Sequence, residues 1–290
     1  MPRSILGITN SAAIFLALFL MSTALRAEPQ IEFAFSGKTS RASTLSELRR
    51  ACPEREVDVD DPYHGRRMSY FALSMRCVVD FGFREEGGAE RIRGERLLLT
   101  ALDGYTRPVS GADVLASGGA LAYGEVALMS GPDSEPRFSL IDRRQVNPAP
   151  FYLIWSEPGQ SDPHTYPWPY QLAKIEVASF EVTFPRTVPT DLPEDDLGWL
   201  GYAHFQRACA SCHSMNGQGG KIGPDLNIPM SIVEYRPIEQ IRNYIRDPEA
   251  TRYTNMPAHP ELSDADLDAL IAYFQAMRNR KQDPRAGDDS

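Results

Sequence analysis

Short runs of alternating apolar and polar residues dominate the chain up to residue 184, a pattern typical of β-strands. The clearest runs are residues 31–35, 151–155 and 175–184, the last with one slip in its alternation. Turn-forming residues at 103–104 and 117–119 separate such runs, and short helices are expected at 45–51 and 112–116. This part of the chain is therefore expected to fold as a mainly β or α+β domain.

The apolar period becomes helical after residue 196. Residues 197–208 are expected to form one helix. A second is expected to have Pro237 at its first position, which proline suits, and to end at Asp247-Pro248. The third begins after Ser263, a good N-cap with Asp266 three residues on, as in a capping box. Its apolar stripe consists of Leu267, Leu270, Ile271, Phe274 and Met277.

Composition marks the boundaries between these regions. Residues 1–27 have a basic start and an apolar stretch too short for a comfortable transmembrane helix; they are expected to be a signal peptide, with a retained membrane anchor as the alternative. A proline-rich, acidic stretch at 186–196 is expected to link a first domain, 28–185, to a second, 197–282. The polar residues 283–290 are expected to be a frayed tail. The expected fold class is α+β multidomain, with an N-terminal mainly β or α+β domain before an all-α domain.

The charge balance narrows the choice of partners. The chain of 290 residues has 39 acidic and 30 basic side chains, a formal net charge of −9. This excess of acid argues against nucleic acid or an anionic membrane surface as the main partner. After loss of the signal peptide, we expect a periplasmic protein with no stable membrane insertion.

The segment Cys209-Ala-Ser-Cys212-His213 has the spacing of a covalent haem attachment site. The two thiols add to the two vinyl groups of haem, and the adjacent histidine faces the iron. A thioredoxin-like redox pair would lie between a strand and a helix, whereas this pair ends a helix and precedes a glycine-rich loop. A zinc site would need a second pair of ligands at metal spacing, and none follows. We predict one covalent haem c, held by Cys209 and Cys212, with His213 as an axial ligand.

A haem that only transfers electrons has both axial positions filled, so a sixth ligand is expected. The preferred candidate is Met256, in a loop that Pro257 stiffens just before the last helix. Four other side chains offer suitable donors: Met215, Met230, His259 and Met277. Met215 follows His213 too closely to reach the other face of the haem, and Met277 belongs to the apolar stripe of the last helix. Met230 and His259 therefore remain the alternatives.

The helices of the last hundred residues resemble those of a class I cytochrome c. In that family a glycine in the first helix lets the terminal helices cross closely. The matching residues are Gly201, Phe205, Cys209, Leu270 and Tyr273. The resemblance implies an all-α fold that carries haem and transfers electrons.

Two loops add to this resemblance. Gly223-Pro224-Asp225-Leu226 is similar to the family's loop in which the proline carbonyl accepts a hydrogen bond from the proximal histidine. Met256-Pro257 is similar to the family's distal ligand pair. The resemblance therefore implies axial ligation by His213 and Met256.

The first domain resembles the sulfite-oxidase-like molybdopterin-binding fold. The resemblance lies in residues 98–106, which contain Asp-Gly-Tyr-Thr, and in the aromatic segments 150–155 and 166–172. Members that hold molybdenum use a cysteine thiolate in a ligand loop. Neither Cys52 nor Cys77 lies in such a loop, and we expect the domain to lack molybdenum. Whether these two cysteines form a disulfide or stay unpaired is open, since export permits the bond and the sequence does not fix its geometry.

Four residues of the first domain have the ligand types of a copper site: His64, Met68, Met75 and Cys77. The simpler interpretation places both methionines in the core and His64 on a loop.

Three functions follow from these features. The preferred one is a periplasmic electron carrier between an exported dehydrogenase and a downstream oxidase or another cytochrome. The second is a molybdenum-dependent oxidoreductase of the sulfite-oxidase type, in which the haem removes electrons. The third is a haem redox sensor or assembly factor. The first needs no catalytic residues.

Overall fold

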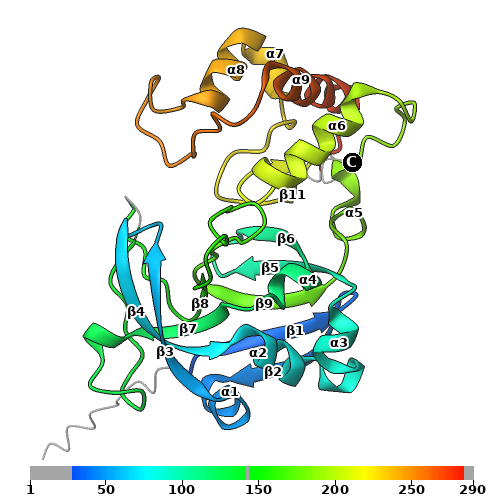
Figure 1. The fold of residues 1–290 in the computed structure, drawn as a ribbon. Coiled ribbons are helices and arrows are strands. Elements are labelled where there is room, and N and C mark those ends of the chain that lie inside the picture. The colour runs from blue at the N-terminus through cyan, green and yellow to red at the C-terminus, as the bar shows by residue number, and fades with distance from the viewer. Residues whose placement is uncertain (1–27, 142–143, 284–290) are drawn as a thin grey trace, which may run out of the picture.

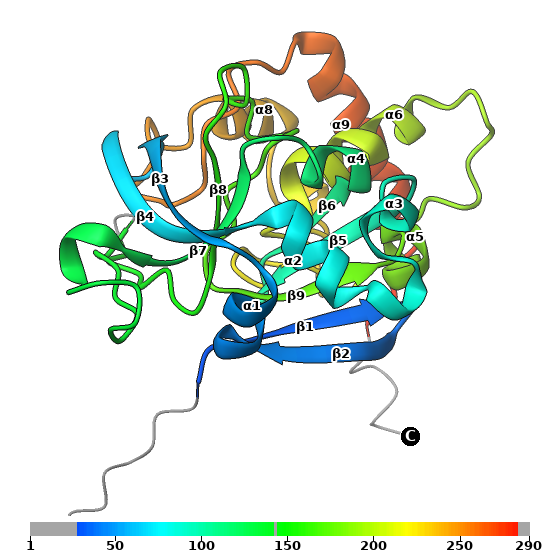
Figure 2. The same cartoon turned by 60° about the horizontal axis from the view of Figure 1, so that its bottom comes forward.

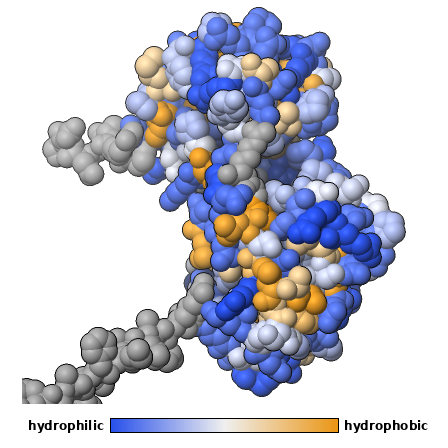
Figure 3. Space-filling view, turned by 90° about the vertical axis from the view of Figure 1, so that its left-hand side faces the viewer, coloured by the Kyte–Doolittle hydropathy of each residue, from blue (hydrophilic) through white to orange (hydrophobic). Residues whose placement is uncertain are grey.

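The computed structural model describes residues 28–141 and 144–283. These form two lobes (Figure 3), which follow one another along the chain (Figure 1). The expected signal peptide, 1–27, and residues 284–290 of the expected tail lie outside the described residues. The first lobe is rich in β-structure and the second is helical, in the order expected for an α+β multidomain chain.

A five-stranded sheet extends through the first lobe, with its β6 edge nearest the helical lobe and β2 at the opposite edge (Figure 1). Its order is β2-β1-β9-β5-β6, and only β1 and β9 run parallel among its paired strands. Its strands are β1 (Gln30–Phe35), β2 (Lys38–Thr44), β5 (Arg96–Ala101), β6 (Thr106–Ser110) and β9 (Leu172–Val177). The expected turn at 103–104 joins β5 to β6, where Gly104 has a φ of +88° that favours glycine.

A second, antiparallel sheet has the order β3-β4-β7-β8. Its strands are β3 (Glu54–Asp61), β4 (Arg66–Ser74), β7 (Gly119–Glu125) and β8 (Tyr152–Trp155). Every residue of β7 and of the edge strand β8 is buried, as expected for strands covered on both faces. The predicted strands at 31–35 and 151–155 are thus confirmed as β1 and β8.

Short helices fill the space around the two sheets: α1 (Leu45–Ala51), α2 (Met75–Gly82), η1 (Arg84–Glu86), α3 (Gly88–Ile92), α4 (Gly111–Val114) and η2 (Val126–Leu128). The predicted helix at 45–51 is confirmed, with Thr44 and Glu47 forming a capping box. Cys52, just after α1, and Cys77, in α2, form a disulfide with their Cα atoms 5.7 Å apart. The structure thereby answers the open question about these two thiols.

The alternation at 175–184 does not continue as one strand, so that part of the prediction is wrong. β9 ends at Val177, and Ser179 then caps the helical turn α5 (Phe180–Thr183) by accepting a hydrogen bond from the Val182 amide, 3.3 Å away. The slip in the alternation marks the residue at which the strand ends. η3 (Pro185–Thr187) follows directly.

Three longer helices and a turn build the second lobe. α6 (Leu197–His204) continues into a π-helical turn, η4 (Phe205–Cys209); α8 (Ile238–Arg246) and α9 (Asp264–Arg278) follow. The predicted capping box at Ser263 is present, and Pro237 is the N-cap of α8 instead of its first residue. Shorter elements are β10 (Ser214–Met215), β11 (Gln218–Gly219) and α7 (Ile232–Tyr235).

α6 and α9 cross at Gly201. A Cβ at this position would lie 1.9 Å from the Ala269 carbonyl oxygen, so a side chain cannot fit there. Phe205 and Tyr273 pack beside the crossing with their ring centroids 5.3 Å apart. The close helix crossing that the sequence predicted is therefore confirmed.

The expected linker, residues 186–196, packs on α9. The Tyr273 hydroxyl donates to the Thr187 carbonyl at 2.7 Å, and Arg280 pairs with Asp191 and donates to the Thr190 hydroxyl at 2.6 Å. Thr187 itself is completely buried. This segment is therefore held in place on the helical lobe.

Within the described part of the chain, no helix has the length and apolar character needed to cross a lipid bilayer.

Candidate haem site

Residues 209–213, called the proximal segment below, begin where the π-helical turn ends. Cys209 is the last residue of that turn, and the amides of Cys212 and His213 both bond to its carbonyl, at 3.0 and 2.9 Å. This tight turn brings both sulfurs and the imidazole to one wall of a cavity. The cavity has a volume of about 330 Å³.

A contact with a backbone carbonyl fixes the orientation of the His213 ring. Its Nδ1 lies 2.8 Å from the Pro224 carbonyl oxygen, the contact implied by the resemblance to cytochromes. Gly223 allows this approach, because a Cβ there would lie 2.5 Å from Cε1 of the ring. With Nδ1 bound to a carbonyl, Nε2 is the nitrogen left to bind a metal.

Met256 lines the same cavity as His213 and is the one methionine among its described lining residues. Its backbone amide bonds to the Thr254 hydroxyl at 3.1 Å, which holds the loop before α9 in place. The structure therefore brings together all four residues predicted to bind haem: Cys209, Cys212, His213 and Met256.

The other candidate ligands lie elsewhere or are already bonded. Met215 is buried in β10, and Met277 is buried in the core along α9, as its place in the apolar stripe predicted. Met230 is half exposed and does not line the cavity. His259 does line it, but its Nδ1 lies 3.0 Å from a Glu261 carboxylate oxygen.

The two thiols are held in their neutral form. Burial raises the pKa of Cys209 to about 12, and the neighbouring Cys212 thiol adds to the effect. Burial and the nearby Asp103 carboxylate raise the pKa of Cys212 to about 11. A reactive redox pair requires a lowered pKa, so these two cysteines lack the electrostatics of a thioredoxin-like site.

The cavity fits haem by the chemistry of its wall. Two thiols, an imidazole and a thioether are the groups that c-type attachment and axial ligation require. Six large apolar side chains also line the cavity, as a largely hydrophobic macrocycle needs: Ile222, Leu226, Ile232, Ile241, Ile245 and Phe274. The donor set and the apolar lining thus agree.

Three arginines also line the cavity: Arg144, Arg236 and Arg252. The guanidinium groups of Arg236 and Arg252 lie over the Tyr244 ring, 5.3 and 5.1 Å from its centroid. The chain as a whole is acidic, with a net charge of −9. The edge of the cavity therefore has the opposite sign to the whole molecule and suits anionic groups.

The first lobe contacts the proximal segment directly. The Thr106 amide lies 3.4 Å from the Ser211 carbonyl oxygen, between the two haem-attachment cysteines. Arg107 is 5% exposed and donates to the Arg207 carbonyl, with a second contact of 3.4 Å to the Ser211 hydroxyl. The β5–β6 hairpin thus covers the segment that holds the two cysteines.

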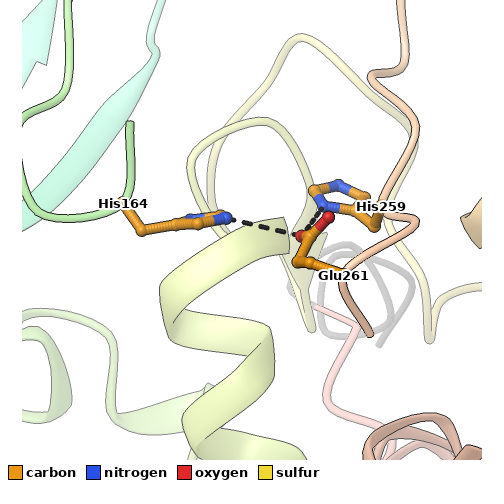
Figure 4. Close-up of side chains that lie close together, drawn as sticks. All are labelled: His164, His259 and Glu261. Atoms are coloured by element: carbon orange, nitrogen blue, oxygen red, sulfur yellow. Dashed lines mark hydrogen bonds and ion pairs between the residues drawn. The ribbon is translucent and has the colours of Figure 1, made fainter. Parts of the chain in front are cut away.

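A second contact joins the first lobe to the loop that carries Met256. His164, in the loop between β8 and β9, points toward Glu261, which lies beside His259 (Figure 4). Nε2 of His164 is 3.5 Å from the Glu261 carboxylate. One atom from each of the three side chains falls within 4.8 Å of the others, so the group has the composition of a possible metal site.

Sequence reasoning missed the roles of four residues: Arg107, Arg144, His164 and Glu261. Each acts across the two lobes, and no local pattern indicates which side chains meet after folding. The one available signal was that Arg107 directly follows the Asp-Gly-Tyr-Thr segment.

The candidate metal ligands of the first lobe do not meet as a copper site. Cys77 is in the disulfide, and Met68 and Met75 are buried in the core. His64 lies in the turn after β3, with its Nδ1 3.2 Å from Asp61. Since the disulfide also takes Cys52, neither cysteine of this lobe is a free thiolate for molybdenum or copper.

Comparison with known proteins agrees with the site. Residues 200–278 match the family model described as cytochrome c. The chain is also similar to a cytochrome c oxidase subunit 2 of Alkalihalophilus pseudofirmus, with 31% identity over 94 residues. That match covers 30% of this chain and 27% of the relative, so the chain spans about a quarter of the relative's length.

The fold, the cavity and the family match define the second lobe as a cytochrome c domain. Such a domain implies a haem cofactor, transfers electrons and works with redox partners.

Proposed function

We propose that the chain is a periplasmic, mono-haem c-type cytochrome. In this proposal Cys209 and Cys212 bind one haem covalently, and His213 and Met256 are its axial ligands. It passes electrons from an exported dehydrogenase to a downstream oxidase or another cytochrome. The observation that carries the proposal is that these four side chains line one apolar cavity.

When bound, the haem supplies a one-electron redox couple. The Pro224 carbonyl oxygen accepts a hydrogen bond from His213 Nδ1, which would leave Nε2 to bind the iron. Met256 would supply the second axial ligand, and the apolar wall, including Phe274, would limit the access of water to the iron. A His/Met pair raises the reduction potential, which suits passage of electrons toward an oxidase.

The location and the partners rest on separate support. The basic and apolar start of residues 1–27 supports export to the periplasm, and covalent haem attachment agrees with that compartment. The similarity to a cytochrome c oxidase subunit supports an oxidase as one electron acceptor. The three arginines at the cavity support docking of an acidic partner surface.

Replacement of the distal ligand tests the proposal. Met256→Ala in the haem-loaded protein should abolish the long-wavelength Met-to-iron charge-transfer band and lower the midpoint potential, because the thioether that favours ferrous iron is lost. Met230→Ala is the matched control, since that methionine is half exposed and outside the cavity. If the unmodified protein lacks the band, or the control loses it as well, the proposed ligation is wrong.

One observation favours a second candidate, an enzyme with a redox group in the first lobe. The segment that resembles the sulfite-oxidase-like fold contacts the haem-attachment segment through Thr106, so a redox group there would lie near the haem. The disulfide between Cys52 and Cys77 opposes ligation of molybdenum by a thiolate. We expect protein purified from a molybdenum-replete host to contain iron without molybdenum. Stoichiometric molybdenum in a metal analysis would favour the enzyme instead.

A further inference from the structure

Arg107 connects the haem-attachment segment to His164, which in turn contacts the loop that follows Met256. Nη1 of its guanidinium bonds to the Arg207 carbonyl and contacts Ser211, next to the haem-attachment cysteines. Nη2 lies 3.0 Å from the His164 carbonyl oxygen and 3.3 Å from its Nδ1. A charge that is only 5% exposed is stable only with such partners, so its position depends on both segments.

His164 continues the connection to the distal loop. Because Nδ1 accepts from Arg107, the ring proton lies on Nε2, which points to the Glu261 carboxylate 3.5 Å away. The same carboxylate accepts from Nδ1 of His259 at 3.0 Å. Figure 4 shows His164 approaching Glu261 from one lobe and His259 from the other.

The loop that carries Met256 is also bonded to its own lobe. The His259 amide donates to the Ile245 carbonyl at 3.0 Å, at the end of α8. His259 and Glu261 follow Met256 by three and five residues. A shift of these two residues would therefore move the methionine relative to His213.

We propose that Arg107 and His164 are positioning residues for the haem ligands. Together they form an interlobe brace, defined as the contacts Arg207–Arg107–His164–Glu261–His259, which holds the Met256 loop at a fixed distance from the proximal segment. The inference rests on the proposed haem function. It assigns the first lobe a role in fixing the axial bond and thus the reduction potential.

The side chains of His164, His259 and Glu261 do not favour a bound metal ion in place of their hydrogen bonds. A metal would need the lone pair of His164 Nε2, but the contact from Arg107 to Nδ1 places the proton on Nε2. A second guanidinium, that of Arg207, acts on His164 electrostatically and further disfavours a cation. The ring nitrogens that face Glu261 already have its carboxylate as their partner, at 3.0 Å from His259 and 3.5 Å from His164.

The test uses the haem-loaded full chain and two variants, each of which removes a contact of the brace. His164→Ala and Glu261→Ala should each raise the affinity for added imidazole, which competes with Met256, by about tenfold, since each removes a charge-assisted hydrogen bond. Both should also lower the midpoint potential and weaken the charge-transfer band. Glu261 is about half exposed, so its replacement leaves the core untouched.

Two variants serve as controls. Glu261→Gln keeps an acceptor oxygen and should stay close to the unmodified protein. His204→Ala removes a different histidine–carboxylate pair, with Asp266 at 2.9 Å, and should have no effect on imidazole affinity. Imidazole affinities of His164→Ala and Glu261→Ala equal to that of His204→Ala would overturn the brace.

Zinc titration provides a further test. Binding of one Zn²⁺ that disappears in His164→Ala would show a metal site and would also overturn the brace. If the unmodified protein shows no Met-to-iron band, the proposed function fails. If it shows the band but His164→Ala and Glu261→Ala leave the imidazole affinity unchanged, the brace alone fails.

Discussion

Histidines of this chain have different roles because their ring nitrogens have different partners. His213 has Nδ1 against the Pro224 carbonyl, while His259 has Nδ1 against Glu261. Sequence spacing predicted the first role, since the haem motif is local. It left His259 open as an axial ligand, because its partner's position depends on the folded loop. At this scale, local motifs are readable from sequence and contacts between distant residues are not.

The protonation of His164 makes the contact between the lobes sensitive to pH. Burial lowers the pKa of His164 below its usual 6.5, and the guanidinium groups of Arg107 and Arg207 lower it further, whereas Asp162 and Glu261 oppose this shift. The contribution of His164 to the stability of the contact is therefore complete above pH 6.5. As the pH falls below 6.5, His164 takes up a proton more readily when the lobes are apart than when they are in contact. The stability of the contact therefore falls until the pH is below the lowered pKa of His164 in the closed protein.

We expect limited proteolysis between the lobes to accelerate as the pH falls from 7.5 to 5.5, measured with an enzyme calibrated at each pH. His164→Gln should remove much of the dependence. An equal pH dependence in this variant would contradict the assignment.

At the scale of elements, periodicity predicted the long helices better than the strand ends. The capping box and apolar stripe of α9 are strong local signals, and both are present. The run at 180–184 was misassigned because Ser179 offers the chain a cap and so favours a helical turn over a strand. The π-helical turn that ends at Cys209 had no signal in the spacing of apolar residues.

The crossing of α6 and α9 should depend strongly on Gly201. Gly201→Ala would place a methyl group 1.9 Å from the Ala269 carbonyl oxygen, so the helices must separate. We expect a loss of about 3 kcal/mol in the free energy of unfolding of this domain. Denaturant unfolding of the haem-loaded protein measures the change.

Gly94→Ala is the control, because no atom lies within 4 Å of the added methyl group. Equal stability of the two variants would show that the crossing tolerates a side chain.

At the scale of the whole molecule, the sequence predicted two successive domains but not how they meet. The contacts of Arg107 and His164 join residues about one hundred positions apart. No periodicity or motif encodes such a pairing, since it depends on the final orientation of two folded lobes. The disulfide was open for the same reason: its geometry follows from where α1 and α2 come to lie.

The segment 186–196 should resist proteolysis, although its composition resembles a flexible linker. Arg280 holds it through Asp191 and Thr190. Arg280→Ala should raise cleavage after Glu194 by a glutamate-specific protease by about threefold to fivefold, as expected for loss of one partly exposed ion pair. Arg278→Ala, an exposed arginine two residues earlier, should leave the cleavage rate unchanged. Equal rates in both variants would mean that Arg280 does not anchor the segment.

The cover that the β5–β6 hairpin forms over Ser211 has a consequence for maturation. Under the proposed covalent attachment, the machinery that forms the two thioether bonds must reach an open Cys209–His213 segment. The first lobe leaves the ribosome earlier, yet in the closed molecule it shields this segment through Thr106 and Arg107. Under that proposal the lobes would close only after the haem is attached, and a chain that closed earlier would be trapped without its cofactor.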